Sequence, residues 1–260
     1  MCPSRGRANK IGKMIKSFED TADREHTELN ILLDDNDSDL QKYKEVVPSW
    51  VKLSVYKKEV NTSSFSKVLN KCFEENKDYE FYCVTADDII FLTKGWDKRF
   101  CNKNKFTTGI DDNIAKKYEG KEFSIPNVIV KGFPTICGMD GDIIRALGWI
   151  ALPCLIHGAI DFVWYCVAKR LHALQIEEDI HWVQNSAFYG NEEVDETFKV
   201  SNSFETKTRD CDAFTYWLKY ECNDDLYRVK KACDDVYKNY IKTEEQLLSS
   251  ALLTKAKGAS

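Results

Sequence analysis

Two adjacent carboxylates, Asp87 and Asp88, follow directly on a segment, 80–84, that has the composition of a β-strand. Aromatic and β-branched residues favour strands, and a second apolar run, 89–92, follows the pair. Two like charges at the end of a buried strand repel each other and lose hydration, so they need a compensating group. A hard divalent cation that also binds phosphate oxygens suits carboxylate ligands. A solvent-exposed acidic turn is the alternative that the spacing leaves open.

A further carboxylate, Asp161, lies inside the apolar stretch 146–168. The stretch is long enough to span a membrane. A carboxylate at the centre of such a helix costs about 2.5–3.5 kcal/mol, and Pro153 and His157 interrupt the stretch further. We therefore expect two buried elements of a soluble core, broken near Pro153, and no transmembrane segment. Burial raises the proton affinity of Asp161 whereas a helix N-terminus lowers it, so Asp161 is a candidate general base.

Three more carboxylates, Asp34, Asp35 and Asp37, follow a short apolar strand predicted at 29–33. In an α/β sheet, ligands bind in the crevice outside the carboxyl ends of the strands. Carboxylates gathered at that edge suit a nucleotide that is held through its ribose hydroxyls and a metal-bound diphosphate. The sequence therefore indicates a nucleotide site whose acidic residues come from distant parts of the chain.

Two arginines near the start of the chain, Arg5 and Arg7, could hold a base or a phosphate, because a guanidinium fork matches that geometry. A solvated loop is the alternative. The phosphate-binding loops of other enzyme classes are missing from the sequence, which contains no GxxxxGK[ST] or GxGxxG pattern. It also contains no GxSxG nucleophile elbow. None of the four histidines stands in an HxxxH or HExxH pattern. P-loop phosphoryl transfer, dinucleotide-dependent hydride transfer and zinc hydrolysis are therefore disfavoured.

Strands and helices alternate along most of the chain, which is typical of a parallel sheet covered on both faces. We expect helices at 9–22, 38–46, 65–73, 140–147 and 162–171, and strands at 29–33, 51–56, 80–84, 89–92, 127–130 and 174–182. The polar segment 102–122 predicts a surface or mobile connection. Beyond about Phe204 the pattern is mostly helical, so we divide the chain into an α/β domain, 1–200, and a helical C-terminal extension, 201–260, packed on it.

The composition is that of a soluble globular protein, with 43% hydrophobic and 30% charged residues among 260. The net charge of −5 argues against broad affinity for nucleic acid or anionic membranes. Ten cysteines occur without a CxxC pair, and no signal peptide is evident, so reduced thiols in the cytoplasm are expected. Cys211, Cys222 and Cys233 recur every eleven residues and predict a packing stripe on a helix rather than a metal site.

Several blocks in order resemble GT-A fold glycosyltransferases, especially the family-2-like enzymes of bacteria, phages and large viruses. The opening Cys2-Pro-Ser-Arg-Gly-Arg7 with 32–37 resembles their first nucleotide-binding block, and Thr85-Ala-Asp-Asp-Ile-Ile-Phe91 with 94–97 resembles their DxD-type metal motif. The segment 133–164, which contains Asp161, resembles their acceptor side. The resemblance covers roughly residues 2–198. It implies a GT-A (Rossmann-like) mixed, mostly parallel sheet flanked by helices.

The resemblance also implies an activity: inverting transfer of a sugar from a nucleotide-diphosphate sugar to a hydroxyl of a glycan or other acceptor. It implies that Asp35 and Asp37 lie near the nucleoside and that Arg5 lies near the base or a phosphate. The enzyme would act in the cytoplasm, or in the host cytoplasm if the chain is viral.

On the reacting side, the resemblance implies a Mn²⁺ or Mg²⁺ ion that Asp88 ligates, with Asp87 beside it on the ribose or on metal-bound water. Gln184 stands where relatives often have a histidine ligand and would be a second metal ligand. Asp161 would deprotonate the acceptor hydroxyl. The cation would stabilise charge on the leaving diphosphate, and the base would strengthen the nucleophile.

The chain departs from the family at three places. It begins at the block that normally follows a first strand, Phe133 replaces a common histidine, and Gln184 and Ser186 replace the late histidines. His181 could substitute only if the strand register shifted by an odd number, which would turn its side chain to the other face. A non-catalytic nucleotide-sugar or glycan-binding homologue is therefore an alternative. A sugar-1-phosphate nucleotidyltransferase is another, although the 4–7 segment is too short for its Gly-rich loop.

Overall fold

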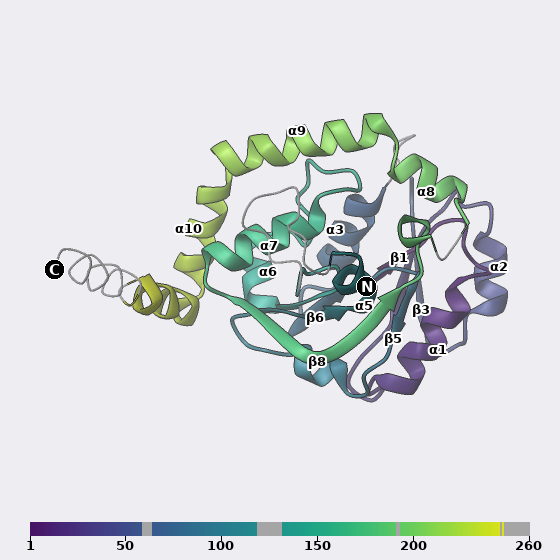
Figure 1. The fold of residues 1–260 in the computed structure, drawn as a ribbon, viewed down its shortest axis with the longest axis horizontal. Coiled ribbons are helices and arrows are strands. Elements are labelled where there is room, and N and C mark those ends of the chain that lie inside the picture. The colour runs from purple at the N-terminus through teal and green to yellow at the C-terminus, as the bar shows by residue number, and fades with distance from the viewer. Residues whose placement is uncertain (59–63, 119–131, 191–192, 245, 247–260) are drawn as a thin grey trace.

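The computed structural model describes residues 1–58, 64–118, 132–190, 193–244 and 246 (Figure 1). In chain order the described elements are β1 (Cys2–Pro3), α1 (Ile11–Thr21), β2 (Asn30–Asp34), α2 (Leu40–Val46), β3 (Lys52–Tyr56), α3 (Phe65–Glu75), β4 (Phe81–Val84), β5 (Ile89–Phe91), α4 (Trp96–Phe100), β6 (Phe106–Asp111), α5 (Asp112–Lys117), β7 (Cys137–Asp140), α6 (Gly141–Leu147), α7 (Ile160–Arg170), β8 (Leu174–Gln184), the 3-10 turn η1 (Ala187–Tyr189), α8 (Glu196–Ser201), α9 (Phe204–Tyr220) and α10 (Cys222–Ala232). The strand expected at 127–130 lies outside the described residues.

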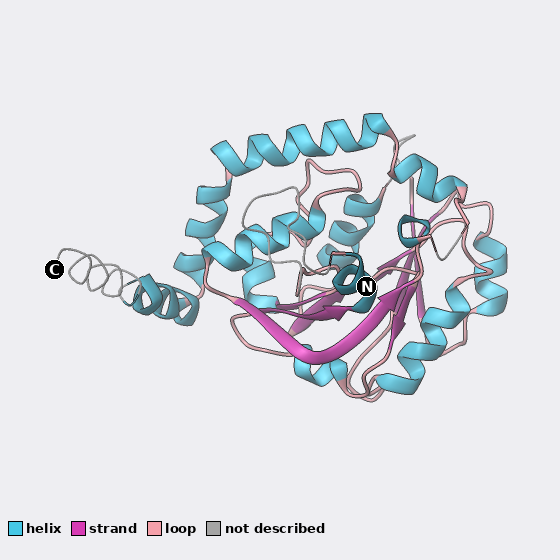
Figure 2. Ribbon diagram, in the orientation of Figure 1, coloured by secondary structure: helices cyan, strands magenta, loops and turns pink. Residues whose placement is uncertain are grey.

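The strands form a three-stranded parallel sheet, β1-β2-β3, and a five-stranded mixed sheet, β4-β7-β6-β8-β5. The two sheets join at Met1, whose amine donates to the carbonyl of Cys83 at 2.7 Å and whose carbonyl accepts from the N–H of Thr85 at 3.0 Å. Within the second sheet, β6 and β8 are parallel and the other described pairings are antiparallel. The expected α/β architecture, a mixed sheet with helices on both faces, is confirmed (Figure 2).

Two apolar cores lie on opposite faces of the sheet, because successive side chains of a strand point to opposite sides. Leu32 of β2 packs with α3, α6 and α7, whereas Ile31 and Leu33 pack with α1 and α2. The same division is visible in Figure 1, where α1 and α2 lie on one side of the strands and α3, α6 and α7 on the other. The sheet is thus held from both sides, and its strand ends are fixed in position.

The prediction of a surface or mobile segment at 102–122 is wrong at 106–111, whereas most of the described residues on either side are half-buried or exposed and 119–122 lie outside the described residues. All six residues of β6 are buried, and the strand lies between β7 and β8. The polar residues of β6 do not follow the apolar pattern of a buried strand, although the structure provides them with hydrogen-bond partners. Thr108 donates its hydroxyl to the carbonyl of Ile136 at 2.8 Å. A side chain at Gly109 would overlap the carbonyl of Ile180 and the ring of Trp182, so glycine lets β8 approach closely.

The helices expected beyond Phe204 are present as α9 and α10, and they share the core that covers α6 and α7. Trp217 of α9 is fully buried and donates its indole N–H to Asp225 at 2.7 Å. Two of the three regularly spaced cysteines, Cys222 and Cys233, are buried in this core, whereas Cys211 is exposed. Among the described helices, none combines the length and the hydropathy that a membrane crossing requires.

Candidate functional site

A cavity of about 670 Å³ opens at the carboxyl ends of β1, β2 and β4. It is bounded further by the end of β8, the N-terminus of α7 and the inner face of α8. Five of the seven site residues predicted from the sequence line this one cavity: Arg5, Asp87, Asp88, Asp161 and Gln184. Residues separated by more than 150 positions therefore meet at one edge of the sheet, as the strand-end argument expects.

Asp87 is buried, and both of its carboxylate oxygens accept hydrogen bonds. One accepts from the hydroxyl of Ser4 at 2.6 Å and the other from the guanidinium of Arg7 at 2.7 Å. Burial by itself lowers the pKa of Arg7, but the charge of Asp87 and the hydrogen bonds to Asp195 and Asp87 raise it overall. Asp87 is thus fully compensated, and it fixes the loop that follows β1.

Asp88 lies in a different environment from its neighbour. Its carboxylate oxygens face the amide nitrogen of Gln184 at 3.2 and 3.4 Å, and Arg7 approaches no closer than 4.0 Å. Burial, followed by the charge of Asp87, raises the pKa of Asp88 to about 7, against the opposing influence of Arg7 and Gln184. This carboxylate has little compensation, which is the condition that a bound cation relieves.

The carboxylate oxygens of Asp88 fit a divalent cation whose remaining ligands come from phosphates and water. Mg²⁺ in nucleotide sites is commonly held by one or two carboxylates plus substrate phosphates. Asp88 would be that carboxylate, since both oxygens of Asp87 are already engaged. The amide of Gln184 presents its nitrogen to Asp88 and would have to turn over to offer its oxygen to a cation.

His181 does not replace the missing histidine. The register of β5 and β8 pairs Ile89 with Gln184, which brings Gln184 beside Asp88. The ring of His181 instead lies 2.7 Å from a carboxylate oxygen of Asp112, away from the residues that line the cavity. The register shift that His181 would need is therefore absent.

At the carboxyl end of β2, the cavity is lined by Asp34 and not by Asp35 or Asp37. Asp34 accepts from the hydroxyl of Ser64 at 2.6 and 2.7 Å and from Arg5 at 2.9 Å. The carboxylate of Asp35 accepts from the backbone of the segment after β3, and that of Asp37 accepts from Gly6 N–H at 3.0 Å, so neither lines the cavity. Asp34 is the last residue of β2, and its carboxylate is the one at this strand end that faces the cavity.

Asp161 lies in the first turn of α7 and is half-buried at the cavity wall. Burial raises its pKa to about 6, although the N–H of Phe162 donates to it at 2.9 Å. Such a carboxylate is mostly ionised at neutral pH yet binds a proton readily, as a general base must. Nearby, His157 also lines the cavity, and burial lowers its pKa to about 4, so its ring is neutral.

The wall that α8 contributes was not predicted from the sequence. Asp195, the N-cap of α8, accepts from Arg7 at 2.9 Å and from Lys10 at 3.3 Å. Thr197 donates to the carbonyl of Arg5 at 2.8 Å. No local sequence pattern links Asp195 to an arginine 188 positions away, so the sequence offered no signal for this contact.

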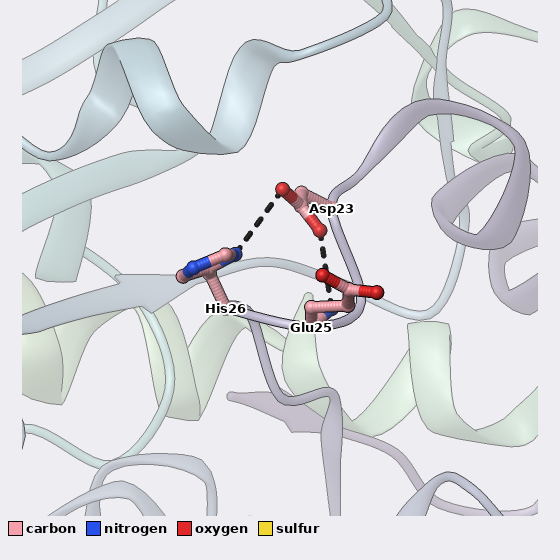
Figure 3. Close-up of side chains that lie close together, drawn as sticks. All are labelled: Asp23, Glu25 and His26. Atoms are coloured by element: carbon pink, nitrogen blue, oxygen red, sulfur yellow. Dashed lines mark hydrogen bonds and ion pairs between the residues drawn. The ribbon is translucent and has the colours of Figure 1, made fainter.

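A second acidic cluster, Asp23, Glu25 and His26, lies outside the cavity (Figure 3). Asp23 accepts from the N–H of Glu25 at 3.1 Å, faces the ring of His26 at 3.2 Å and pairs with Lys98 at 2.7 Å. Glu25 and His26 are exposed. These contacts account for the cluster as a turn after α1.

The sheets and the helices that flank them form an α/β fold of the GT-A type. Among solved structures, the chain is similar to S. aureus TarS, with a TM-score of 0.53 at 11% identity over 93% of this chain and 54% of that one. The structure of S. aureus TarS 1-349 in complex with UDP gives a TM-score of 0.52 at 14% identity over 95% of this chain and 90% of that one.

This chain therefore spans about half the length of the longer TarS chain. At such identities the similarity shows the fold, and the expected GT-A class is confirmed, whereas membership of family 2 stays a prediction. No protein-family model matches the sequence, and a sequence search of curated proteins finds no match.

Proposed function

We propose that the protein transfers a sugar from a nucleotide-diphosphate sugar to a hydroxyl group of a glycan or another acceptor. The observation that carries this proposal is that Asp34, Asp88 and Asp161 line one cavity of about 670 Å³. Its volume lies within the range of about 300–1,000 Å³ that is usual for small-molecule sites. The fold, which is similar to that of a UDP-bound structure, supports the same assignment.

The donor would lie along the cavity with its nucleoside toward Asp34. Arg5 and Ser64 hold the Asp34 carboxylate rigidly, so it can accept a hydrogen bond from a base or ribose without first losing water. The diphosphate would lie beside Asp88, where Mn²⁺ or Mg²⁺ would be bound jointly by that carboxylate and the phosphates. When bound, the cation would neutralise charge on the departing diphosphate.

Asp161 would act at the opposite end as the general base. With a pKa raised to about 6, it would accept the proton of the acceptor hydroxyl while that oxygen attacks the anomeric carbon. The carbon–oxygen bond to the diphosphate would break as the new glycosidic bond forms. A single in-line attack inverts the configuration, so we propose an inverting enzyme.

Nucleotide binding and turnover test this proposal separately. A thermal-shift screen of UDP, GDP and dTDP with Mn²⁺ should raise the apparent stability for at least one nucleotide, because a ligand that binds only the native state stabilises it. Turnover of UDP-, GDP- and dTDP-sugars should then be measured for the wild type and Asp88→Ala. Undiminished turnover in Asp88→Ala would remove Asp88 from the proposed site.

One observation favours a second candidate, a nucleotide-sugar-binding protein without turnover. Gln184 stands at the position of the expected histidine ligand and donates to Asp88 at 3.2 Å, which partly compensates the carboxylate without a cation. Nucleotide binding with no sugar transfer or hydrolysis for any donor of the panel would favour this candidate. Binding together with turnover that Asp88→Ala abolishes would eliminate it.

A further inference from the structure

The loop that leads into α7 is held by a carboxylate of the C-terminal helices. The backbone N–H groups of Ile156, His157 and Gly158 all donate to Asp210 of α9, at 2.8, 2.9 and 2.6 Å. Asp210 is only 1% exposed. In Figure 1, α9 runs above α7 in the view.

This loop places two groups of the candidate site. His157 itself lines the cavity, and Asp161 follows in the first turn of α7. Between them Ala159 has φ +60°, a left-handed conformation that costs an L-residue roughly 1–2 kcal/mol. A residue keeps such a conformation only where the surrounding structure enforces it. Three hydrogen bonds to one carboxylate, immediately before Ala159, supply such enforcement.

The structure describes a second contact on this loop, since the N–H of Ser66 donates to the carbonyl of Ile156 at 3.3 Å, but that hydrogen bond joins two neutral groups. The N-cap of α7, Ala159, makes no side-chain cap hydrogen bond. A buried carboxylate is also a costly way to pack a helix, since an apolar side chain would fill the space without losing hydration. Charge-assisted hydrogen bonds are roughly twice as strong as neutral ones, so a carboxylate suits the task of fixing a backbone loop.

We infer that Asp210 is a positioning residue for the reaction: it fixes the loop at 156–159 and thereby sets where Asp161 and His157 stand in the cavity. The inference rests on the proposed transfer function. It gives α9, which the sequence assigned to an extension outside the catalytic domain, a supporting role for the active site. A displacement of about 1 Å in a reacting group can lower a rate about 100-fold.

Asp210→Asn tests this role, because the amide keeps the size of the side chain but turns one acceptor into a donor that opposes the loop N–H groups. Asp212→Asn, two positions along α9 on its exposed face, is the matched control. Turnover should be measured with whichever donor of the UDP-, GDP- and dTDP-sugar panel reacts fastest in the wild type. We expect kcat to fall about 10- to 100-fold in Asp210→Asn, with KM for the donor within about twofold of the wild type.

Two further readouts separate positioning from a general loss of stability. The acid limb of the kcat–pH profile should shift in Asp210→Asn, because the surroundings of Asp161 change. Amide hydrogen exchange should accelerate at Ile156, His157 and Gly158 but not in β6. Wild-type kcat and an unshifted pH profile in Asp210→Asn would overturn the positioning role alone. An inactive wild type would overturn the proposed function, and this inference with it.

Discussion

At one end of the cavity, Asp34 accepts hydrogen bonds from Ser64 and Arg5, and Lys58 approaches to 3.5 Å. At the other end, burial raises the pKa of Asp161 to about 6, and in the middle burial and Asp87 raise that of Asp88 to about 7. A carboxylate whose charge is balanced by hydrogen bonds and cations keeps a fixed position. A carboxylate whose charge is poorly balanced binds a cation or a proton more readily. This contrast supports our proposal that the end at Asp34 binds the donor, whereas Asp88 and Asp161 take part in the reaction.

The largest expected effect is that of Asp161→Asn on turnover. Removal of a general base typically lowers a rate about 10²- to 10⁴-fold, and kcat should fall within that range. The affinity for UDP should stay within about twofold of the wild type, because the nucleoside end is untouched. Steady-state kinetics and calorimetry on the same preparation provide both values. A variant that loses UDP binding as well would break the proposed division between the two ends.

Asp88→Asn should lower turnover by about 100-fold or more, since one electrostatic contact at the reacting group is commonly worth a factor of 10²–10³. The part of UDP affinity that depends on Mn²⁺ should disappear as well. Titrations of UDP with and without Mn²⁺ measure this difference. An equal gain from Mn²⁺ in the wild type and in the variant would place the cation elsewhere.

The nucleoside end is tested by a pair of neighbouring residues, Asp34 and Asp35. Asp34→Asn should weaken UDP binding about tenfold, as expected for the loss of a hydrogen bond to a charged group. Asp35→Asn should change it less than about twofold, because its carboxylate does not line the cavity. Calorimetric dissociation constants decide between them. The reverse ranking would restore the placement that the sequence suggested.

The smallest expected effect concerns stability and pH. The pKa of Asp161 is raised from 3.8 to about 6, so folding favours its protonated form. The group therefore contributes stability below about pH 4 that is lost as the pH rises through about 6. At pH 8, Asp161→Asn should melt roughly 2–4 °C above the wild type, the shift that about 1 kcal/mol produces in a chain of this size. The gap should close near pH 4; a constant gap would contradict the raised pKa.

The pH dependence of turnover follows from the same groups. Both Asp161 and Asp88 must be ionised to act, so kcat should fall as the pH falls from 8 to 5. In Asp161→Asn, any residual activity should lose the step near pH 6. An unchanged step would assign it to another group.

The sequence predicted those parts of the molecule that depend on local patterns. Apolar spacing predicted α1 and α3, and the acidic pair after β4 predicted two residues that line the cavity. Polarity misled at β6, where buried threonines and a glycine form a central strand. The family resemblance implied Asp35, whereas Asp34, the last residue of β2, lines the cavity.

Contacts between distant residues could not be predicted from the sequence alone. Arg7 meets Asp195 across 188 positions, and the loop at 156–158 meets Asp210 across more than 50. Asp195 and Asp210 belong to no local sequence motif, because the residues that they contact are distant in the sequence and only the fold brings them together. The division of the chain at residue 200 stays a prediction, although the contact of Asp210 with the loop before α7 argues for functional continuity across it.

The most direct measurement is a calorimetric titration of UDP, GDP and dTDP into the wild type and Asp88→Asn, each with and without Mn²⁺. The account predicts saturable binding of at least one nucleotide diphosphate to the wild type, strengthened about tenfold or more by Mn²⁺, and no such gain in the variant. Absence of binding for every nucleotide, with Mn²⁺ present, would contradict a nucleotide-sugar site in this cavity.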